Sequence, residues 1–312
     1  VDTGGDVSPM SATAQAGTPP DPAAPASVMA TAASAARVTV AWSETIPPGG
    51  LAIQSYNILR GTSPTGLTQL ASRAASPFID IAVSAGTAYY YAIEAVDTGA
   101  DVSPMSASAL VSTPPMPAAP VNLAATATSG TAVTVTWLEN IPLNGLAIQN
   151  YNIFRGTSPT GLTQLASRAA SPFIDAGTTP NTTYYYAIQA VDTGQDLSAM
   201  SQTIQVTTPP APAAPASVVA IAESATAVSI SWSENIPPNG LPIQFYNIFR
   251  GTSPTGLTQL ISRSASQFID TGVSANTTYY YAIQAVDSGH GLSSMSGTAE
   301  VTTPPLGNSR TP

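Results

Sequence analysis

The sequence repeats itself every 95 residues, and this period restricts the fold more than any other feature of the chain. The three tryptophans Trp42, Trp137 and Trp232 are evenly spaced (137 − 42 = 232 − 137 = 95). Copies of the segment YNILRGTSPTGLTQLASR begin at Tyr56, Tyr151 and Tyr246, and no insertion or deletion is needed to align them. A fixed period of this length indicates one structural unit that is used several times.

Proline-rich runs separate the units. TPPDPAAP, TPPMPAAP and TPPAPAAP begin at Thr18, Thr113 and Thr208. They predict three units and a short tail, at residues 21–115 (repeat 1), 116–210 (repeat 2), 211–305 (repeat 3) and 306–312. Proline at this density favours polyproline II, so we expect semi-rigid junctions between the units.

Residues 1–20 match residues 96–115, which are the end of a unit. We therefore expect the first twenty residues to be the C-terminal remnant of a preceding repeat, with its last turn and last strand. Two explanations are open: the chain samples a longer repeat protein, or the segment is a strand donated to the sheet of a neighbouring molecule.

Within one unit the apolar residues alternate with polar ones at the period of a β-strand. In repeat 2 this pattern predicts strands around 133–137, 151–155, 162–165, 173–174, 184–190 and 204–206. Asn144-Gly145 supplies a turn between the first two. No helical period is present, so the fold class is all-β. Seven or so short strands in about 95 residues predict a two-sheet sandwich.

The order of these motifs resembles the fibronectin type III domain of bacterial extracellular proteins. Each unit has a strand ending in Trp, then Tyr-x-Ile-x-Arg, then Tyr-x-Tyr-x-Ile-x-Ala-Val-Asp. The resemblance implies that Trp42, Trp137 and Trp232 are core residues on strand B. It also implies that Tyr89, Tyr184 and Tyr279 form a tyrosine corner at the start of strand F. Buried Trp and Tyr side chains are expected to find partners for their polar atoms.

Charge is scarce in this chain. Charged residues make up 8% of the sequence, all eight basic residues are Arg, and the net charge is −9. This balance argues against nucleic acid as a partner. A membrane span needs about 18 consecutive apolar residues, and no apolar run in the chain approaches that length. No signal peptide starts the chain. Membrane insertion is therefore not expected. With no cysteine, disulfides and thiolate metal sites are excluded.

Nothing in the sequence predicts catalysis. His290 is the only histidine and lies in a turn, and no lysine or glycine-rich phosphate loop is present. The DTGxD turns are candidate calcium sites, because Asp97 and Asp101 recur there as Asp192 and Asp196, and the remnant keeps Asp2 and Asp6. Two carboxylates fall short of the six to eight oxygens that Ca²⁺ takes, so ordinary turns are favoured. We expect no enzyme activity, no metal and no cofactor.

The few charges recur from unit to unit. Four positions carry a charge in all three units: Arg60, Arg155 and Arg250; Arg73, Arg168 and Arg263; Glu44, Glu139 and Glu234; and Asp80, Asp175 and Asp270. This repetition predicts ion pairs that join loops or neighbouring units, with simple solubility as the alternative.

One outward-facing apolar patch is predicted in each unit. If Tyr184 and Tyr186 face the core, Tyr185 faces outward, and the same alternation turns Phe154 outward on the neighbouring strand. The predicted interaction patch is formed by Leu59 and Tyr90, Phe154 and Tyr185, and Phe249 and Tyr280. It is suited to sugar rings, a sister domain or another molecule, or else is only a cross-strand pair that stabilises its sheet.

The function expected from the sequence is structural: an extracellular or cell-surface rod, stalk or filament segment. Low charge and edge strands without lysine favour self-association or contact with another extracellular protein. The alternatives are a spacer or carbohydrate-binding accessory module of a secreted bacterial hydrolase, with polysaccharide as partner, and an adhesin stalk.

Overall fold

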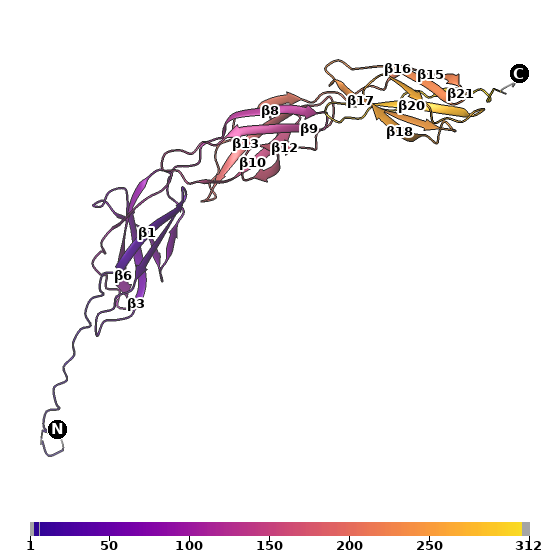
Figure 1. The fold of residues 1–312 in the computed structure, drawn as a ribbon. Coiled ribbons are helices and arrows are strands. Elements are labelled where there is room, and N and C mark those ends of the chain that lie inside the picture. The colour runs from indigo at the N-terminus through magenta and orange to yellow at the C-terminus, as the bar shows by residue number, and fades with distance from the viewer. Residues whose placement is uncertain (1–2, 6, 308–312) are drawn as a thin grey trace. The chain divides into compact units, whose positions relative to one another are not determined.

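The computed structural model describes residues 3–5 and 7–307 (Figure 1). All regular structure in these residues is β-strand. None of them belongs to a helix of the length and apolarity needed to cross a bilayer. Each repeat is described below by itself.

Repeat 1 folds into two antiparallel sheets. The three-stranded sheet has the order β1 (Ala26–Ser34), β2 (Arg37–Ser43) and β5 (Phe78–Asp80). The four-stranded sheet has the order β4 (Thr68–Arg73), β3 (Ile53–Gly61), β6 (Ala88–Asp97) and β7 (Ala109–Ser112). Since β2, β4 and β5 are each followed by a strand of the other sheet, the chain crosses repeatedly between two layers, as in immunoglobulin-like sandwiches.

Repeats 2 and 3 have the same strand order. In repeat 2 the sheets are β8 (Val121–Ser129), β9 (Ala132–Leu138) and β12 (Phe173–Asp175), and β11 (Thr163–Arg168), β10 (Ile148–Gly156), β13 (Thr183–Asp192) and β14 (Ile204–Thr207). In repeat 3 they are β15 (Ala216–Ser224), β16 (Ala227–Ser233) and β19 (Gln267–Asp270), and β18 (Thr258–Arg263), β17 (Ile243–Gly251), β20 (Thr278–Asp287) and β21 (Ala299–Thr302). The all-β sandwich predicted from the alternation is therefore present in each repeat.

The core of each repeat lies between its two sheets. In repeat 2 the inward residues of β9, β10 and β13 form one buried cluster, which includes Trp137, Tyr151 and Tyr186. Trp42, Trp137 and Trp232 are 7%, 3% and 5% exposed. Each meets the edge of the following Tyr ring at a centroid distance of 5.2 Å, a favourable geometry for aromatic pairs.

The indole nitrogen of Trp42 differs from expectation, because it is buried and has no hydrogen-bond partner. Burying an indole of about 200 Å² contributes on the order of 5 kcal/mol. An unpaired buried donor costs about 1–3 kcal/mol. The packing of the ring therefore outweighs the lost hydrogen bond.

The segment before the last strand is held by serine side chains. In repeat 2, Ser198 Oγ accepts from the backbone N–H of Ala190, and Ser201 Oγ accepts from that of Ile188, both at 2.9 Å. The backbone N–H groups of the two serines donate to the carbonyls of the same strand residues. This segment therefore extends the edge of the sheet although it is not itself a regular strand.

The proline runs are more closely attached to the repeats than an exposed spacer would be. Thr208, the first residue of its run, is 1% exposed. Its Oγ1 accepts from Thr182 N at 3.0 Å and donates to Thr179 O at 2.6 Å. Pro212 and Pro215 are also buried. Thr113 makes the same bonds in repeat 1, so the runs that begin at Thr113 and Thr208 close the turns before β6 and β13.

No strand is assigned within residues 3–5 and 7–20, the described part of the predicted remnant. Asp2 and Asp6 lie outside the described residues, as do residues 308–312 of the predicted tail.

Candidate interaction surface

The predicted patch residues lie on the outer face of the four-stranded sheets. In repeat 3, Phe249 on β17 is directly opposite Ala282 on β20, and Gly251 is directly opposite Tyr280. In repeat 1 the same positions pair Leu59 with Ala92 and Gly61 with Tyr90. The two large side chains of each patch are therefore diagonal neighbours, and each faces a residue with a small side chain or none.

The alanine of each patch is covered although it points away from the core. Ala92, Ala187 and Ala282 are 0%, 1% and 1% exposed. Strand alternation turns them outward, so only side chains of the same face can cover them. The side chains that surround each alanine on this face therefore cover it.

Leu59 departs from the sequence prediction because it is only 8% exposed. Tyr90, Phe154, Tyr185, Phe249 and Tyr280 are half-buried. A branched aliphatic side chain is compact enough to be almost enclosed beside Ala92, whereas the larger Phe ring extends beyond the cover of its neighbours. Repeat 1 therefore presents less apolar surface at this position than repeats 2 and 3.

Amide side chains border each patch. Gln69 Nε2 donates to Asn57 Oδ1 at 3.0 Å, and Gln164 and Asn152 make the same contact at 3.1 Å. In repeat 3 the row is longer, since Gln259 donates to Asn247 Oδ1 and Asn247 Nδ2 donates to Gln284 Oε1, both at 3.3 Å. Each amide group has donors or acceptors beyond these bonds, so the patch combines ring surface with hydrogen-bonding capacity.

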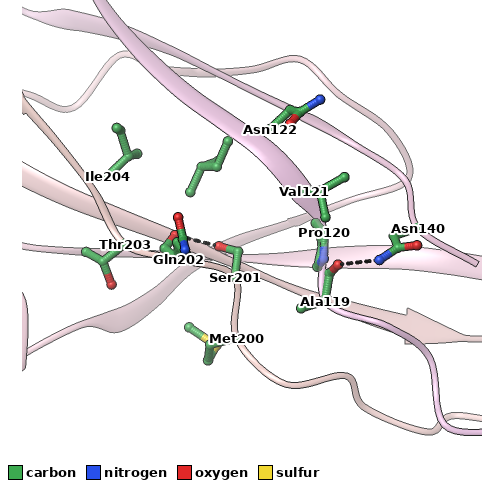
Figure 2. Close-up of a pocket in the computed structure, with 11 residues that line it drawn as sticks. Ala119, Pro120, Val121, Asn122, Asn140, Met200, Ser201, Gln202, Thr203 and Ile204 are labelled. Atoms are coloured by element: carbon green, nitrogen blue, oxygen red, sulfur yellow. Dashed lines mark hydrogen bonds between the residues drawn. The ribbon is translucent and has the colours of Figure 1, made fainter.

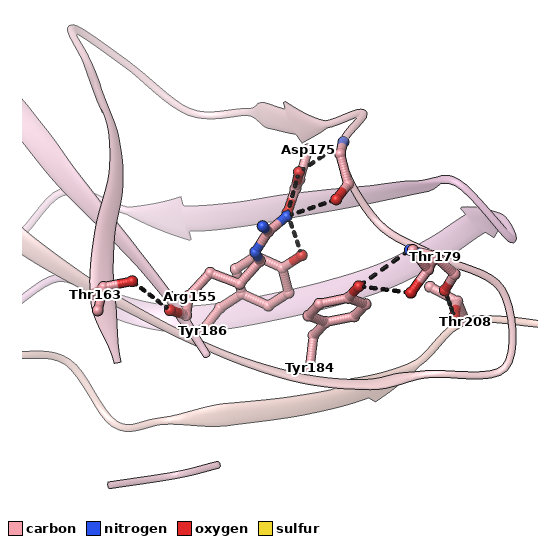
Figure 3. A network of polar contacts seen from close by, with 8 residues as sticks. Arg155, Thr163, Asp175, Thr179, Tyr184, Tyr186 and Thr208 are labelled. Atoms are coloured by element: carbon pink, nitrogen blue, oxygen red, sulfur yellow. Dashed lines mark hydrogen bonds and ion pairs between the residues drawn. The ribbon is translucent and has the colours of Figure 1, made fainter. Parts of the chain in front are cut away.

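An ion pair lies on the inner side of the same sheets (Figure 3). In repeat 2, Arg155 Nη1 is 2.7 Å from Oδ2 of Asp175, which is 3% exposed, and Tyr186 Oη donates to the same oxygen at 2.6 Å. Asp175 Oδ1 also accepts from the backbone N–H of Gly177. Repeats 1 and 3 have the same network around Asp80 and Asp270.

This network shifts the proton affinity of its members. Burial, the hydrogen bond to Asp175 and its negative charge together raise the pKa of the Tyr186 hydroxyl above its ordinary value near 10. Burial lowers the pKa of Arg155, but the hydrogen bond and charge of Asp175 outweigh it and leave the pKa raised. Both oxygens of Asp175 are thus engaged inside the domain.

The other recurring charges also act within their own repeats. Arg73, Arg168 and Arg263 lie over the rings of Phe78, Phe173 and Phe268, with the guanidinium carbon 5.2–5.7 Å from the ring centroid. Glu44, Glu139 and Glu234 accept hydrogen bonds from Tyr56, Tyr151 and Tyr246. The recurring charges thus hold loops and strands of one domain together.

In the DTGxD segments the first aspartate binds the backbone of its own turn. Asp97 is 1% exposed, and its Oδ1 accepts from the backbone N–H groups of Gly99 and Asp101 at 2.9 and 3.0 Å. His290 lies in the equivalent turn of repeat 3 with a φ of 63°. No group of three or more His, Cys, Asp or Glu side chains in the described part of the chain is arranged to hold a metal ion.

A hollow of about 590 Å³ lies in repeat 2 beside the start of β8 (Figure 2). Asn140 Nδ2 donates to Ala119 O at 3.3 Å at one end, and Met200 and Ile204 line the other. None of its eleven lining residues is charged or titratable, so it offers no acid, base or metal ligand.

Sequence reasoning did not identify the serines and threonines that anchor the turns. Ser198, Ser201 and Thr208 are buried, although each lies in a stretch that reads as loop or linker. Their 95-residue recurrence was the available signal, since Ser103, Ser106 and Thr113 occupy the same positions in repeat 1.

Comparison with known proteins finds similarity to bacterial polysaccharide-degrading enzymes. The chain is 31% identical to Exoglucanase B of Cellulomonas fimi over 90% of its own length, and this match spans 26% of that protein. It is 28% identical to Endoglucanase B of Cellulomonas fimi and 28% identical to Chitinase A1 of Niallia circulans, over 82% and 66% of this chain and 25% and 28% of those proteins. The chain therefore spans about a quarter of the length of these relatives. No family model matches it.

Among solved structures, the chain resembles the FN1-FN3 domains of chicken CNTN1. The two are 17% identical, the match covers 91% of this chain and 100% of that one, and the TM-score is 0.35. The assignment of the domain type rests on the strand order of the two sheets, the buried Trp of the second strand and the Tyr that begins the sixth. Tyr89, Tyr184 and Tyr279 accept hydrogen bonds from the backbone N–H five residues upstream, at Ser84, Thr179 and Ser274, which is the geometry of a tyrosine corner. The chain is a tandem array of fibronectin type III domains.

Proposed function

We propose that this chain is a non-catalytic accessory region of a secreted bacterial polysaccharide-degrading enzyme, in which it spaces other domains from one another. One observation carries the proposal: the same array aligns with relatives named for different reactions, an exoglucanase, an endoglucanase and a chitinase. A segment that accompanies several chemistries is better explained by a mechanical or positioning task than by a role in any one of them.

The side chains of the repeats support a non-catalytic role. Asp80, Asp175 and Asp270 are the recurring buried carboxylates that pair with Arg, and each is also bound by a Tyr hydroxyl. Glycoside hydrolysis needs two carboxyl groups on either side of an open cleft. Asp80, Asp175 and Asp270 are instead bound within their repeats, where they act as internal braces.

A fusion experiment tests the spacer role. A β-1,4-glucanase catalytic domain is joined to a cellulose-binding module either directly or through this full chain. We expect faster release of soluble sugar from insoluble cellulose with the chain in place, and equal rates on a small soluble substrate. Equal rates on both substrates for the two proteins would overturn the proposal.

A rod or filament segment is the second candidate. Its support is an aliphatic side chain at the same position of the edge strands β5, β12 and β19, where Ile79, Ile174 and Ile269 are 52%, 63% and 61% exposed. Edges with exposed apolar residues and no lysine favour pairing between copies. Sedimentation equilibrium decides this candidate: a mass that stays near 31.6 kDa at every protein concentration is incompatible with self-assembly.

A further inference from the structure

We infer that the outer face of the four-stranded sheets in repeats 2 and 3 is a binding platform for a neutral, β-linked polysaccharide. Tyr185 and Tyr280 would provide the stacking surface, with Phe154 and Phe249 beside them. The inference deepens the proposed function, and rests on it for the identity of the glycan.

The rings of Tyr280 and Phe249 lie opposite small residues in the sheet. Tyr280 faces Gly251, Phe249 faces Ala282, and Ala282 is 1% exposed although it lies on the outer face. Because the residues opposite the two rings have a small side chain or none, these residues do not obstruct a ligand that stacks on a ring face. The axial C–H groups of a β-linked pyranose form a flat apolar surface, which buries well against such a face.

Amide groups border the rings. The amide row Gln259–Asn247–Gln284 begins beside Phe249 in the sheet, since Phe249 is opposite Gln259 in the register. In repeat 2, Asn152 and Gln164 form the same pair. Amide groups both donate and accept, as sugar hydroxyls do, and a binding surface with a few fixed polar groups around an apolar centre gains orientation from them.

The side chains around Tyr185 are uncharged. The chain has a net charge of −9, yet the outer face of repeat 2 carries only neutral side chains around Tyr185: Asn152, Phe154, Gln164, Gln189 and Gln205. Removing charged groups from water is costly, whereas this face has none to desolvate. An uncharged, hydroxyl-rich polymer therefore fits it better than an ionic partner.

The three repeats are not equivalent in this respect. Repeat 1 has the almost enclosed Leu59 where the others have Phe, and Glu94 where they have Gln189 and Gln284. Repeat 3 has Glu300 opposite Tyr280, where repeat 2 has Gln205 opposite Tyr185. The affinity is thus expected to decrease from repeat 2 to repeat 3 to repeat 1.

Affinity electrophoresis of the full chain in native gels tests the inference. The probe is hydroxyethylcellulose, a soluble neutral β-glucan, and anionic carboxymethylcellulose is the charged comparison. We expect hydroxyethylcellulose to retard the wild type in proportion to its concentration, with less retardation by carboxymethylcellulose. Changing both Tyr185→Ser and Tyr280→Ser is expected to weaken the apparent affinity by about tenfold or more, which corresponds to about 1.4 kcal/mol.

Matched variants separate binding from folding. Tyr185→Phe with Tyr280→Phe keeps the rings and should retain most of the retardation. Ile174→Ser changes an exposed residue of the other sheet and should leave retardation unaltered, as should Tyr90→Ser in repeat 1, to within about twofold. Circular dichroism of every variant reports whether the sheets are intact.

Three results would overturn the inference. They are unaltered mobility of the wild type in hydroxyethylcellulose, equal retardation of the wild type and the variant with both Tyr185→Ser and Tyr280→Ser, and a shift that depends on protein concentration instead of polysaccharide. The last result would assign the face to contact between copies. If the wild type does not bind but the fusion protein still accelerates hydrolysis of insoluble cellulose, only the platform is refuted and the spacer function stands.

Discussion

Tyr186 Oη and Arg155 Nη1 both bind Oδ2 of Asp175, at 2.6 and 2.7 Å, inside repeat 2. The three side chains come from β13, β10 and β12, so this contact joins the four-stranded sheet to the edge of the three-stranded one (Figure 3). The same three residue types meet in the other two repeats. A chain with few charges thus uses several of them to connect the layers of each sandwich.

Changing Asp175→Asn should destabilise repeat 2 selectively. The variant leaves Arg155, whose side chain is 24% exposed, without its counter-charge in a largely enclosed site. Breaking a buried ion pair costs about 3–5 kcal/mol, and the partial exposure of Arg155 places the effect near the lower end. Hydrogen exchange followed by mass spectrometry resolves the repeats, and protection should fall in the strands of repeat 2 but not in those of repeats 1 and 3.

The matched control is Glu139→Gln. Glu139 is exposed and accepts one hydrogen bond, from Tyr151, and its amide replacement can still accept, so the change should cost less than about 1 kcal/mol. Equal loss of protection in the two variants would show that the ion pair of Asp175 stabilises repeat 2 no more than the exposed hydrogen bond of Glu139 does.

Changing Thr208→Val should cost about 2 kcal/mol, although Thr208 belongs to a proline-rich run. Valine has nearly the same shape but cannot accept from Thr182 N or donate to Thr179 O, and buried polar groups left unpaired cost about 1–3 kcal/mol. In chemical denaturation of the full chain, the unfolding transition of repeat 2 should move to a lower denaturant concentration.

The neighbouring residue supplies the comparison. Thr207 is exposed on β14, and its Oγ1 pairs only with that of Thr183 at the surface. Thr207→Val should therefore change stability by less than about 0.5 kcal/mol. A larger effect at position 207 than at position 208 would contradict the assignment of Thr208 to the domain interior.

Much of the fold follows from the sequence because its strands alternate strongly. Val133, Val135 and Trp137 define β9 with a clean period of two, and the Tyr-x-Tyr-x-Ile motif defines β13. In β9 the buried Val133, Val135 and Trp137 alternate with Thr134 and Thr136, and in β13 Tyr184, Tyr186 and Ile188 are buried at the same period. The 95-residue repeat then transfers each assignment to the other domains.

The first strand of each domain could not be predicted in this way. In β8 the half-buried residues are Leu123, Ala125 and Ala127, and alanine has little preference for strands. Its membership in the sheet is decided by pairing with β9. The burial of Leu59 was also not predictable, because it depends on how a neighbouring ring and a small residue share the outer face.

The structure predicts alkaline unfolding. Burial, a hydrogen bond to a carboxylate and its charge raise the pKa of six tyrosines above their ordinary value near 10, at Tyr56, Tyr91, Tyr151, Tyr186, Tyr246 and Tyr281. The folded chain therefore holds these protons to a higher pH than the unfolded chain, and unfolding releases them. Their contribution to stability is complete below about pH 10 and is lost as the pH rises toward the folded-state values.

Ultraviolet absorbance of tyrosinate and circular dichroism, recorded together, check this prediction. Of the twelve tyrosines, these six should ionise only as the sheet signal is lost, whereas all twelve should titrate together in a chain unfolded by guanidinium. Ionisation of all twelve near pH 10 with the sheets intact would contradict it.

Changing Ala100→Gly should stabilise repeat 1. Ala100 has a φ of 69° in the turn that follows β6, and its backbone N–H donates to Asp97 O at 3.0 Å. For residues with a Cβ, a left-handed conformation costs about 1–2 kcal/mol. Glycine removes that cost but gains freedom in the unfolded chain, which offsets part of the benefit. The net gain should be about 0.5–1 kcal/mol.

The neighbouring Gly99 gives the opposite expectation and serves as the control. A Cβ added there would lie 3.0 Å from Leu51 Cδ1 and 3.2 Å from Asp97 Oδ1, so Gly99→Ala should crowd the turn and weaken the bond from Gly99 N to Asp97 Oδ1. Thermal unfolding of the full chain measures both variants, and we expect the transition of repeat 1 to rise with Ala100→Gly and fall with Gly99→Ala. If both changes lower it, the turn is held by the side chain at position 100 and not by the backbone bonds to Asp97.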